Sequence, residues 1–131
     1  MKTTRVDKWF SLYIRLRDCD ENRLAKCCTC GKVVDVKYAD CGHFIKRQHM
    51  ATRFDEVNCA VQCKHCNAFE QGKDVDFERY ILTRWGEEKL MMLKFAKRTA
   101  VTCTAFMLKM KADYWKEQAR LKATVKGIEL W

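Results

Sequence analysis

The chain has 131 residues, and its 26 Lys and Arg residues against 17 Asp and Glu residues give it a formal net charge of +9. This length allows one domain with a modest core, and the positive charge favours an anionic partner, for which nucleic acid is the usual case. No apolar run approaches the roughly 20 residues of a membrane span, and the N-terminal residues lack the apolar stretch of a secretory signal. We therefore expect a cytoplasmic protein that makes no contact with a membrane.

The first predicted element is a helix over residues 5–18. Its apolar side chains recur mostly at steps of three and four with basic residues between them, which is the pattern of an amphipathic helix. They are Val6, Trp9, Phe10, Tyr13, Ile14 and Leu16.

Two strands and a short helix are predicted next. Residues 32–40 alternate β-branched or aromatic side chains with charged ones, which suits a strand, and the apolar run at 57–63 predicts a second strand. A basic loop over 44–56 joins the two strands. A short helix then opens at 63–67, and Gly72 is expected to end it.

The rest of the chain is predicted to be helical. Asp74 is expected to cap the start of a helix that Gly86 closes, and a further helix covers 87–97. Beyond a break near 99–102, small or apolar residues step by four and three, which is a heptad-like pattern. This stripe consists of Val101, Ala105, Leu108, Ala112, Trp115 and Ala119. We expect it to pack onto its own domain, and a homodimer through the C-terminal helices is the alternative.

Nine cysteines, an odd number, fit a disulfide framework poorly and favour metal binding in a reducing compartment. Two C-x-x-C pairs, Cys27 with Cys30 and Cys63 with Cys66, allow four thiolates to converge on one Zn²⁺ ion. Such a site has no open position, so the zinc would be structural and would hold together the elements around it. Cys28 is the alternative to one member of the first pair. The remaining cysteines match no ligand pattern and are expected to be small core residues: Cys19, Cys41, Cys59 and Cys103.

Together these elements predict an α+β fold in one domain over residues 1–131. Its expected parts are an N-terminal helix (1–23), a zinc-bound core (24–86) and a helical C-terminal extension (87–131).

The stretch YADCGHF lies between the two cysteine pairs and places Asp40, Gly42 and His43 close together. His43 on a first strand, Asn58 on a second strand and Asn67 at the head of a helix follow the order found in HNH (ββα-metal) nucleases. The segment between the cysteine pairs resembles that motif.

The wider sequence is similar to the phage NinG family, the recombination nucleases of the lambda Rap group that act on branched DNA. The motifs WFSLYIRLRD, DCGHF, ATRFDEVN, QCKHCN and RYILTRWG carry this similarity over roughly residues 8–86. The resemblance implies a zinc-stabilised HNH core flanked by the N-terminal and C-terminal helices.

The HNH resemblance also implies roles for two of these residues in phosphodiester hydrolysis, which needs an activated water. His43 would be the general base, because an imidazole that is neutral near pH 7 can accept a proton from water. Asn58 would form a hydrogen bond across the strands that orients the histidine ring.

Catalysis of this kind also needs a divalent cation, and Mg²⁺ and Mn²⁺ prefer oxygen ligands. The resemblance implies that Asp40 and Asn67 hold this ion. In a regular strand residue 40 would face away from the histidine, so we expect a turn or bulge at Gly42. Asp55 and Glu70 are the alternatives to Asp40.

Basic residues surround the predicted site, and we expect them to contact the DNA backbone without reading its sequence. They are Lys46, Arg47, Arg53, Lys64 and Lys73. The sequence thus predicts a metal-dependent HNH endonuclease that is selective for branched recombination intermediates such as Holliday junctions or D-loops, in the host-cell cytoplasm if the chain is phage-encoded. The alternatives are a non-catalytic zinc-binding DNA module and a sequence-specific HNH endonuclease.

Overall fold

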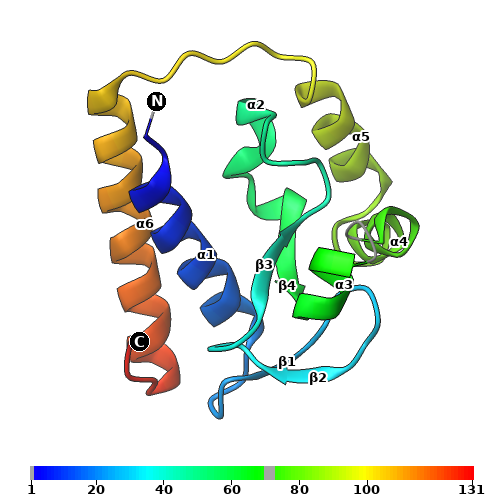
Figure 1. The fold of residues 1–131 in the computed structure, drawn as a ribbon, viewed down its shortest axis with the longest axis vertical. Helices are drawn as coiled ribbons and strands as arrows, with labels where there is room; N and C mark the ends of the chain where they lie inside the picture. Colours follow the sequence, from blue (N-terminus) through cyan, green and yellow to red (C-terminus); the bar gives the residue numbers. More distant parts are fainter. Residues whose placement is uncertain (1, 70–72) are drawn as a thin grey trace.

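The chain combines helices with short antiparallel strands in an α+β arrangement (Figure 1). The computed structural model describes residues 2–69 and 73–131. Within them, no helix is long and apolar enough to cross a membrane. The elements are α1 (Thr4–Asp18), β1 (Leu24–Lys26), β2 (Val33–Asp35), β3 (Asp40–His43), α2 (Met50–Arg53), the 3-10 turn η1 (Glu56–Asn58), β4 (Cys59–Gln62), α3 (Lys64–Phe69), α4 (Asp74–Trp85), α5 (Glu87–Ala96) and α6 (Ala105–Lys126).

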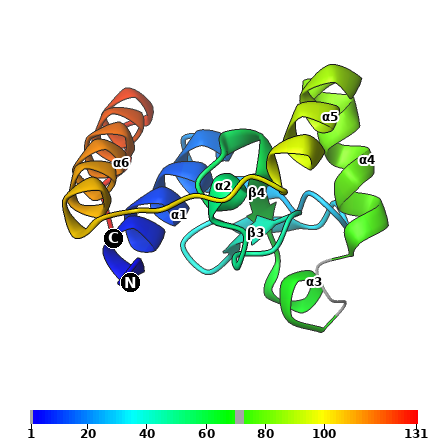
Figure 2. The same ribbon diagram turned by 90° about the horizontal axis from the view of Figure 1, so that it is seen from above.

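The hairpin of β3 and β4 lies between two groups of helices, with α1 and α6 on one side and α4 and α5 on the other (Figure 2). The strands pair antiparallel from Asp40 opposite Gln62 to His43 opposite Cys59. Helix α3 follows β4 directly. β1 and β2 form a second, separate antiparallel pair.

Helix α6 packs along α1, and the predicted helix over 5–18 is confirmed as α1. The rings of Phe10 and Trp115 meet edge to face with centroids 4.8 Å apart. The buried part of the predicted stripe is Leu108, Ala112, Trp115 and Ala119. These residues pack within their own chain, whereas Val101 and Ala105 are exposed. A homodimer through the C-terminal helices stays a prediction, as does the division of the chain into three parts.

The predicted strand over 32–40 is wrong, because the chain turns in the middle of it. The carboxylate of Asp35 accepts a hydrogen bond from the backbone N–H of Lys37 (2.9 Å), and its carbonyl accepts one from Tyr38 (3.0 Å). These bonds close a turn of the kind that aspartate favours. The first half of the segment pairs with β1, which the sequence did not reveal, and His43 lies on the next strand, β3.

The segment between β3 and β4 is more regular than the predicted loop over 44–56, because it contains α2 and η1. The carboxylate of Asp55 accepts a hydrogen bond from the N–H of Val57 and starts the 3-10 turn. The strand predicted over 57–63 is correspondingly shorter, and Asn58 is the last residue of η1, before the strand.

Helix α4 has a different start from the predicted one. Lys73 is the residue before the helix and has a left-handed φ of 50°. Asp74 is therefore the first helical residue and not the cap, although its carboxylate and that of Asp76 still lie at the helix N-terminus, where negative charge is favourable. The end at Gly86 is confirmed, and the expected stop at Gly72 lies outside the described residues.

Gly42 lies in a regular strand, so the predicted bulge is wrong. β3 and β4 pair residue for residue from Asp40 to His43. A Cβ at Gly42 would collide with the side chain of Gln62, whose Cβ would be 2.9 Å away. Glycine is therefore required by a close approach across the hairpin and not by a kink.

Asp18, at the end of α1, joins three elements through buried ion pairs. Its carboxylate, 8 % exposed, accepts hydrogen bonds from Arg17 (2.8 Å), from Arg84 of α4 (2.9 Å) and from the backbone N–H of Val61 in β4 (3.3 Å). Burial alone would raise the pKa of Asp18, but the two guanidinium groups outweigh it and lower the pKa below its usual value.

We expect Asp18→Asn to lower the free energy of unfolding at pH 7 by about 3 kcal/mol, because the buried guanidinium of Arg17 loses its charged partner. The lowered pKa means that this stabilisation is present above the ordinary aspartate pKa and is lost as the pH falls through the folded-state value. The difference between the wild type and the variant, measured by urea unfolding, should therefore shrink in acid.

The matched control is Asp20→Asn. Asp20 is exposed and accepts hydrogen bonds from the backbone of Asn22 and Leu24, which an amide oxygen can also accept. Equal stability of the two variants at pH 7 would contradict the role given to Asp18.

Candidate functional site

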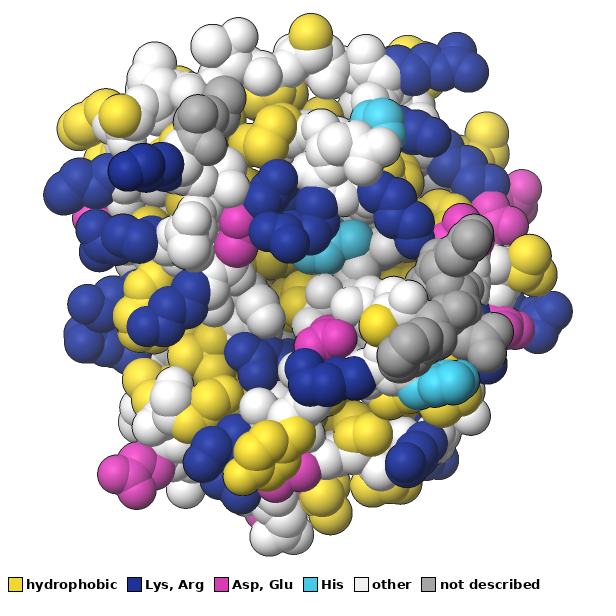
Figure 3. All heavy atoms as spheres, in the orientation of Figure 1, with side chains coloured by type: hydrophobic (Ala, Val, Ile, Leu, Met, Phe, Trp, Pro, Cys, Tyr) yellow, Lys and Arg dark blue, Asp and Glu magenta, His cyan; other side chains and the backbone are white. Residues whose placement is uncertain are grey.

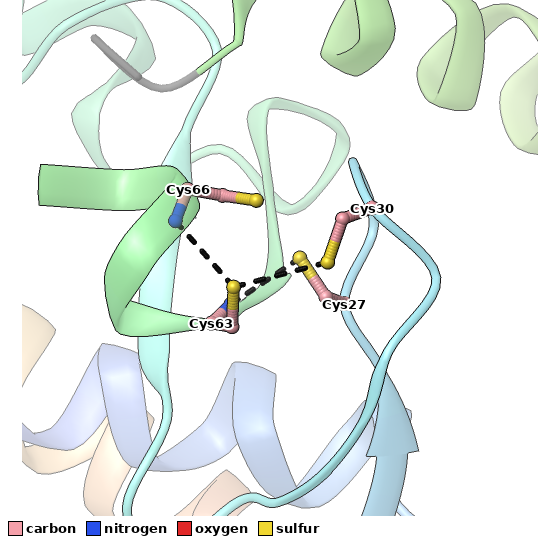
Figure 4. Close-up of side chains that lie close together, drawn as sticks. All are labelled: Cys27, Cys30, Cys63 and Cys66. Atoms are coloured by element: carbon pink, nitrogen blue, oxygen red, sulfur yellow. Dashed lines mark hydrogen bonds between the residues drawn. The ribbon is translucent and has the colours of Figure 1, made fainter. Parts of the chain in front are cut away.

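The four predicted zinc ligands converge in space (Figure 4). Their sulfur atoms all lie within 4.8 Å of one another, and the Sγ atoms of Cys30 and Cys63 are 3.9 Å apart. Backbone N–H groups of the second pair point at sulfur, from Cys63 to Cys27 (3.3 Å) and from Cys66 to Cys63 (3.4 Å). This cluster could hold a metal ion such as zinc, which would tie the segment after β1 to the start of α3.

The protonation of the cluster suits a divalent ion. Burial raises the pKa of Cys27, but hydrogen bonds from the backbone of Cys63 and the side chain of Thr29 outweigh it and lower the pKa to about 6. Burial raises the pKa of Cys66 to about 12, and the negative charge of Cys27 adds to the effect. One thiolate therefore makes it harder to deprotonate the next thiol, and a cation at the centre of the cluster would remove that repulsion.

The predicted alternative ligand, Cys28, lies outside this cluster. Its backbone N–H donates to the carbonyl of Val61 (2.9 Å), and burial raises the pKa of its thiol. The structure thus selects Cys27 and Cys30 as the first pair.

A second feature, an open cleft of about 860 Å³, lies between α1, β3 and the start of α3. Figure 3 shows Lys and Arg side chains gathered around a histidine and an acidic side chain near the middle of this face. Six of the predicted site residues line the cleft: Asp40, His43, Lys46, Arg47, Lys64 and Asn67.

His43 is held in one orientation by the loop that follows its strand. Its Nε2 lies 2.9 Å from the backbone oxygen of Arg53, and the ring of Phe10 packs against it with centroids 6.5 Å apart. Because a carbonyl oxygen accepts, Nε2 carries the proton and Nδ1 keeps the lone pair. Burial lowers the pKa of His43 below its usual value, which favours the neutral ring, although the backbone of Arg53 and of Cys41 acts in the opposite direction.

Asn58 acts on this loop and not on the histidine ring. It is fully buried, and its side chain accepts from the N–H of Ile45 (2.7 Å) and donates to the carbonyls of Ile45 and Thr52 (both 3.0 Å). The expected hydrogen bond from Asn58 to the ring is therefore replaced by three bonds to backbone. Since the residue after Thr52 supplies the carbonyl that holds His43, Asn58 is a positioning residue.

Asp40 and Asn67 meet across the gap between β3 and α3. The Nδ2 of Asn67 donates to Oδ2 of Asp40 (3.0 Å), and Nζ of Lys64 lies 2.8 Å from Oδ1. Of the alternatives to Asp40, Asp55 caps η1, and Glu70 lies outside the described residues.

The predicted DNA contacts separate into two groups. Lys46 and Arg47 line the cleft with Lys64, and each forms an ion pair, with Asp74 (3.0 Å) and Asp7 (3.1 Å) respectively. Their side chains are about half exposed, so these pairs are weak and exchangeable.

Arg53 and Lys73 lie elsewhere. Arg53 is 15 % exposed and binds both carboxylate oxygens of Asp7 (2.9 and 2.7 Å) and the hydroxyl of Thr3, so it fastens the loop to α1. Lys73 lines a neighbouring hollow beside Cys63 and Cys66.

The sequence analysis missed one wall of the cleft, which is the polar face of α1. The residues on it are Thr4, Lys8, Ser11 and Arg15. They follow one another at steps of four, three and four, so the helical period that identified the core face also contained this signal. Lys37, from the turn between β2 and β3, adds a further positive charge.

The fold and the site define a small, basic α+β protein with a four-cysteine cluster able to hold a metal ion. A family model described as Bacteriophage Lambda NinG protein matches residues 3–127. The chain therefore belongs to the NinG family, a recombination-related family of phage proteins. This match confirms the family resemblance and extends it from the core into the C-terminal helices. Comparison with curated proteins and with solved structures gave no match.

We expect Cys63→Ser to lose zinc from the four-cysteine cluster. Zinc at a free concentration of 100 times its Kd stabilises a folded protein by about 2.7 kcal/mol, so the variant should lose about that amount of unfolding free energy. Zinc per chain, measured by atomic emission after dialysis against buffered zinc and compared with the wild type, tests the first effect, and urea unfolding tests the second. Cys103→Ser, at a buried cysteine outside the cluster, is the control. Full retention of zinc by Cys63→Ser would contradict the assignment.

Proposed function

We propose that the protein is a metal-dependent DNA endonuclease of the HNH type, selective for branched recombination intermediates in the host-cell cytoplasm. The observation that carries this proposal is that Asp40, His43 and Asn67 line one open cleft with basic side chains around it. Family membership supports the link to recombination, and the succession of β3, β4 and α3 supports the HNH assignment.

In this proposal His43 is the general base. The carbonyl of Arg53 fixes Nε2–H, so Nδ1 can take a proton from a water molecule that attacks the scissile phosphodiester. The products would carry 5′-phosphate and 3′-hydroxyl ends. Because Asn58 holds the loop that supplies this carbonyl, it keeps the base in place without touching the substrate.

The residues around Asp40 fit a hard cation. Its carboxylate and the side-chain amide of Asn67 converge at 3.0 Å, and a 180° rotation of that amide would present its oxygen instead of its nitrogen. Two oxygen donors beside open solvent suit Mg²⁺ or Mn²⁺, which keep several of their own water ligands. When bound, such an ion neutralises charge on the phosphate and on the leaving 3′ oxygen.

The cleft binds DNA through its phosphates. Lys46, Arg47 and Lys64 surround the site with exposed ammonium and guanidinium groups, whose ion pairs with carboxylates can be exchanged for phosphate oxygens. Phosphate contacts carry no sequence information, so selection by DNA shape is favoured over selection by sequence.

We expect His43→Ala to slow nicking of a labelled four-way junction by at least about 100-fold while junction binding is retained, because a general base contributes this much or more. The assay uses zinc-loaded protein with added Mg²⁺ or Mn²⁺, and a matched linear duplex tests selectivity. His49→Ala is the control, since His49 lies in the same segment but outside the cleft.

Two outcomes would overturn the proposal. If the wild type binds both DNAs but cuts neither with any divalent ion, the protein is a non-catalytic zinc-binding DNA module. If it cuts the linear duplex at one sequence as readily as the junction, it is a sequence-specific endonuclease.

The role of the basic side chains around the cleft can be tested separately by the salt dependence of DNA binding. We expect Arg47→Gln and Lys64→Gln each to reduce the slope of log K against log salt by about 0.9, the value for one lost phosphate contact. Lys89→Gln, at an exposed position on α5 away from the cleft, should leave the slope unchanged. If all three variants kept the wild-type slope, the DNA would bind on another face.

A further inference from the structure

We propose that Cys41, His43 and Cys59 form a second metal site, which binds Zn²⁺ at the floor of the cleft. The metal site follows from its ligands alone. Its consequence, that zinc bound there switches off cleavage by occupying His43, rests on the proposed function.

The hairpin brings the three side chains to one face. Cys41 and His43 are two residues apart on β3, so they point the same way, and Cys59 is the direct cross-strand partner of His43. This face is turned towards α1, whose Phe10 packs against the histidine ring. The expectation that Cys41 and Cys59 are merely small core residues overlooked this pairing, because it depends on the register.

The distances suit a tetrahedral zinc ion. One ring nitrogen of His43 and the two sulfur atoms lie within 4.8 Å of one another. Zn–S and Zn–N bonds of about 2.3 and 2.0 Å place such donors about 3.5–3.8 Å apart, so an approach of about 1 Å closes the site. The diagonal positions of the two cysteines favour a shared metal over a disulfide, since diagonal Cα atoms are about 7–8 Å apart and a disulfide needs less than about 7 Å.

With Nδ1 of His43 as the ligand, a second shell for this site already exists. Metal-binding histidines usually donate their other N–H to a carbonyl or carboxylate, and His43 donates Nε2–H to the carbonyl of Arg53. The Sγ of Cys59 also points at this oxygen, at 4.0 Å. Asn58 and the ion pair of Arg53 with Asp7 fix the segment that carries it.

Access and ligand chemistry both favour a soft ion. Cys41 and His43 line the cleft while Cys59 is buried beneath them, so an ion can enter from solvent and keep a fourth position open to water. Two thiolates and an imidazole select Zn²⁺ over Mg²⁺, whereas Asp40 and Asn67 offer oxygen and suit Mg²⁺. The two ions would therefore occupy different donors in the same cleft.

The consequence for cleavage follows from the imidazole. A ring nitrogen that ligates zinc has no lone pair for a proton, so His43 cannot act as a base while the ion is bound. Release of zinc restores the base without any change of fold. The second site would thus act as an inhibitory zinc sensor, separate from the four-cysteine cluster.

The test counts zinc ions on reduced protein. Wild type, Cys41→Ser and Cys103→Ser are dialysed against buffered zinc in the presence of a phosphine reductant, and zinc per chain is measured by atomic emission. We expect the wild type and Cys103→Ser to take up a second equivalent, and Cys41→Ser to bind it at least about 100-fold more weakly, which exceeds the usual cost of losing a second-shell partner. Cobalt titration provides a second readout, because the ligand-field bands of the second equivalent should vanish in Cys41→Ser.

Cleavage of the junction in Mg²⁺, with and without excess zinc, then tests the consequence. We expect zinc to inhibit the wild type at least tenfold more than Cys41→Ser. A wild type that binds a single equivalent, or a Cys41→Ser variant that keeps the second, overturns the metal site whether or not the protein is a nuclease. A second equivalent that leaves wild-type cleavage unchanged overturns the inhibitory role, and absence of all cleavage overturns the proposed function while the metal count stands.

Discussion

The hairpin of β3 and β4 is covered on both faces, and the rest of the structure depends on this constraint. Alternate residues of β4 enter different clusters, since Cys59 and Val61 pack with α1 and α6 whereas Ala60 packs with α4 and α5. One face is covered by the first and last helices of the chain and the other by α4 and α5 from its middle, and Asp18 links the two by joining α1 to α4 and β4. Within the described residues β3 pairs with β4 alone, so its other edge carries no strand. The cleft lies along β3.

The position of His43 depends on how the chain returns from β3 to β4. Two anchors hold the returning segment. The buried side chain of Asn58 binds its backbone, and the side chain of Arg53 binds Asp7 of α1. Both lie next to the carbonyl that accepts from the ring. The imidazole is therefore oriented by buried hydrogen bonds to backbone, which have a definite geometry and do not depend on a second mobile side chain.

The sequence was most informative where the signal is local. The apolar face of α1, the stop at Gly86 and the two C-x-x-C pairs are set by short spacings, and all three were predicted correctly. The strand over 32–40 failed because one side chain, Asp35, turns the chain in the middle of a β-like pattern. The role of Asn58, the anchoring of Arg53 and the need for glycine at position 42 depend on tertiary contacts, which residue spacing does not contain.

The alternation of side chains along β3 also separates two sets of potential metal donors. Odd-numbered positions of β3 turn thiol and imidazole towards α1, and Asp40 turns a carboxylate towards α3. Both groups line one cleft, and in the proposed scheme soft and hard cations would be sorted by donor atoms and not by distance. A one-residue slip in register would exchange these faces and would also place a side chain against Gln62. The close approach at Gly42 therefore fixes the register, and with it the separation of the two sets of donors.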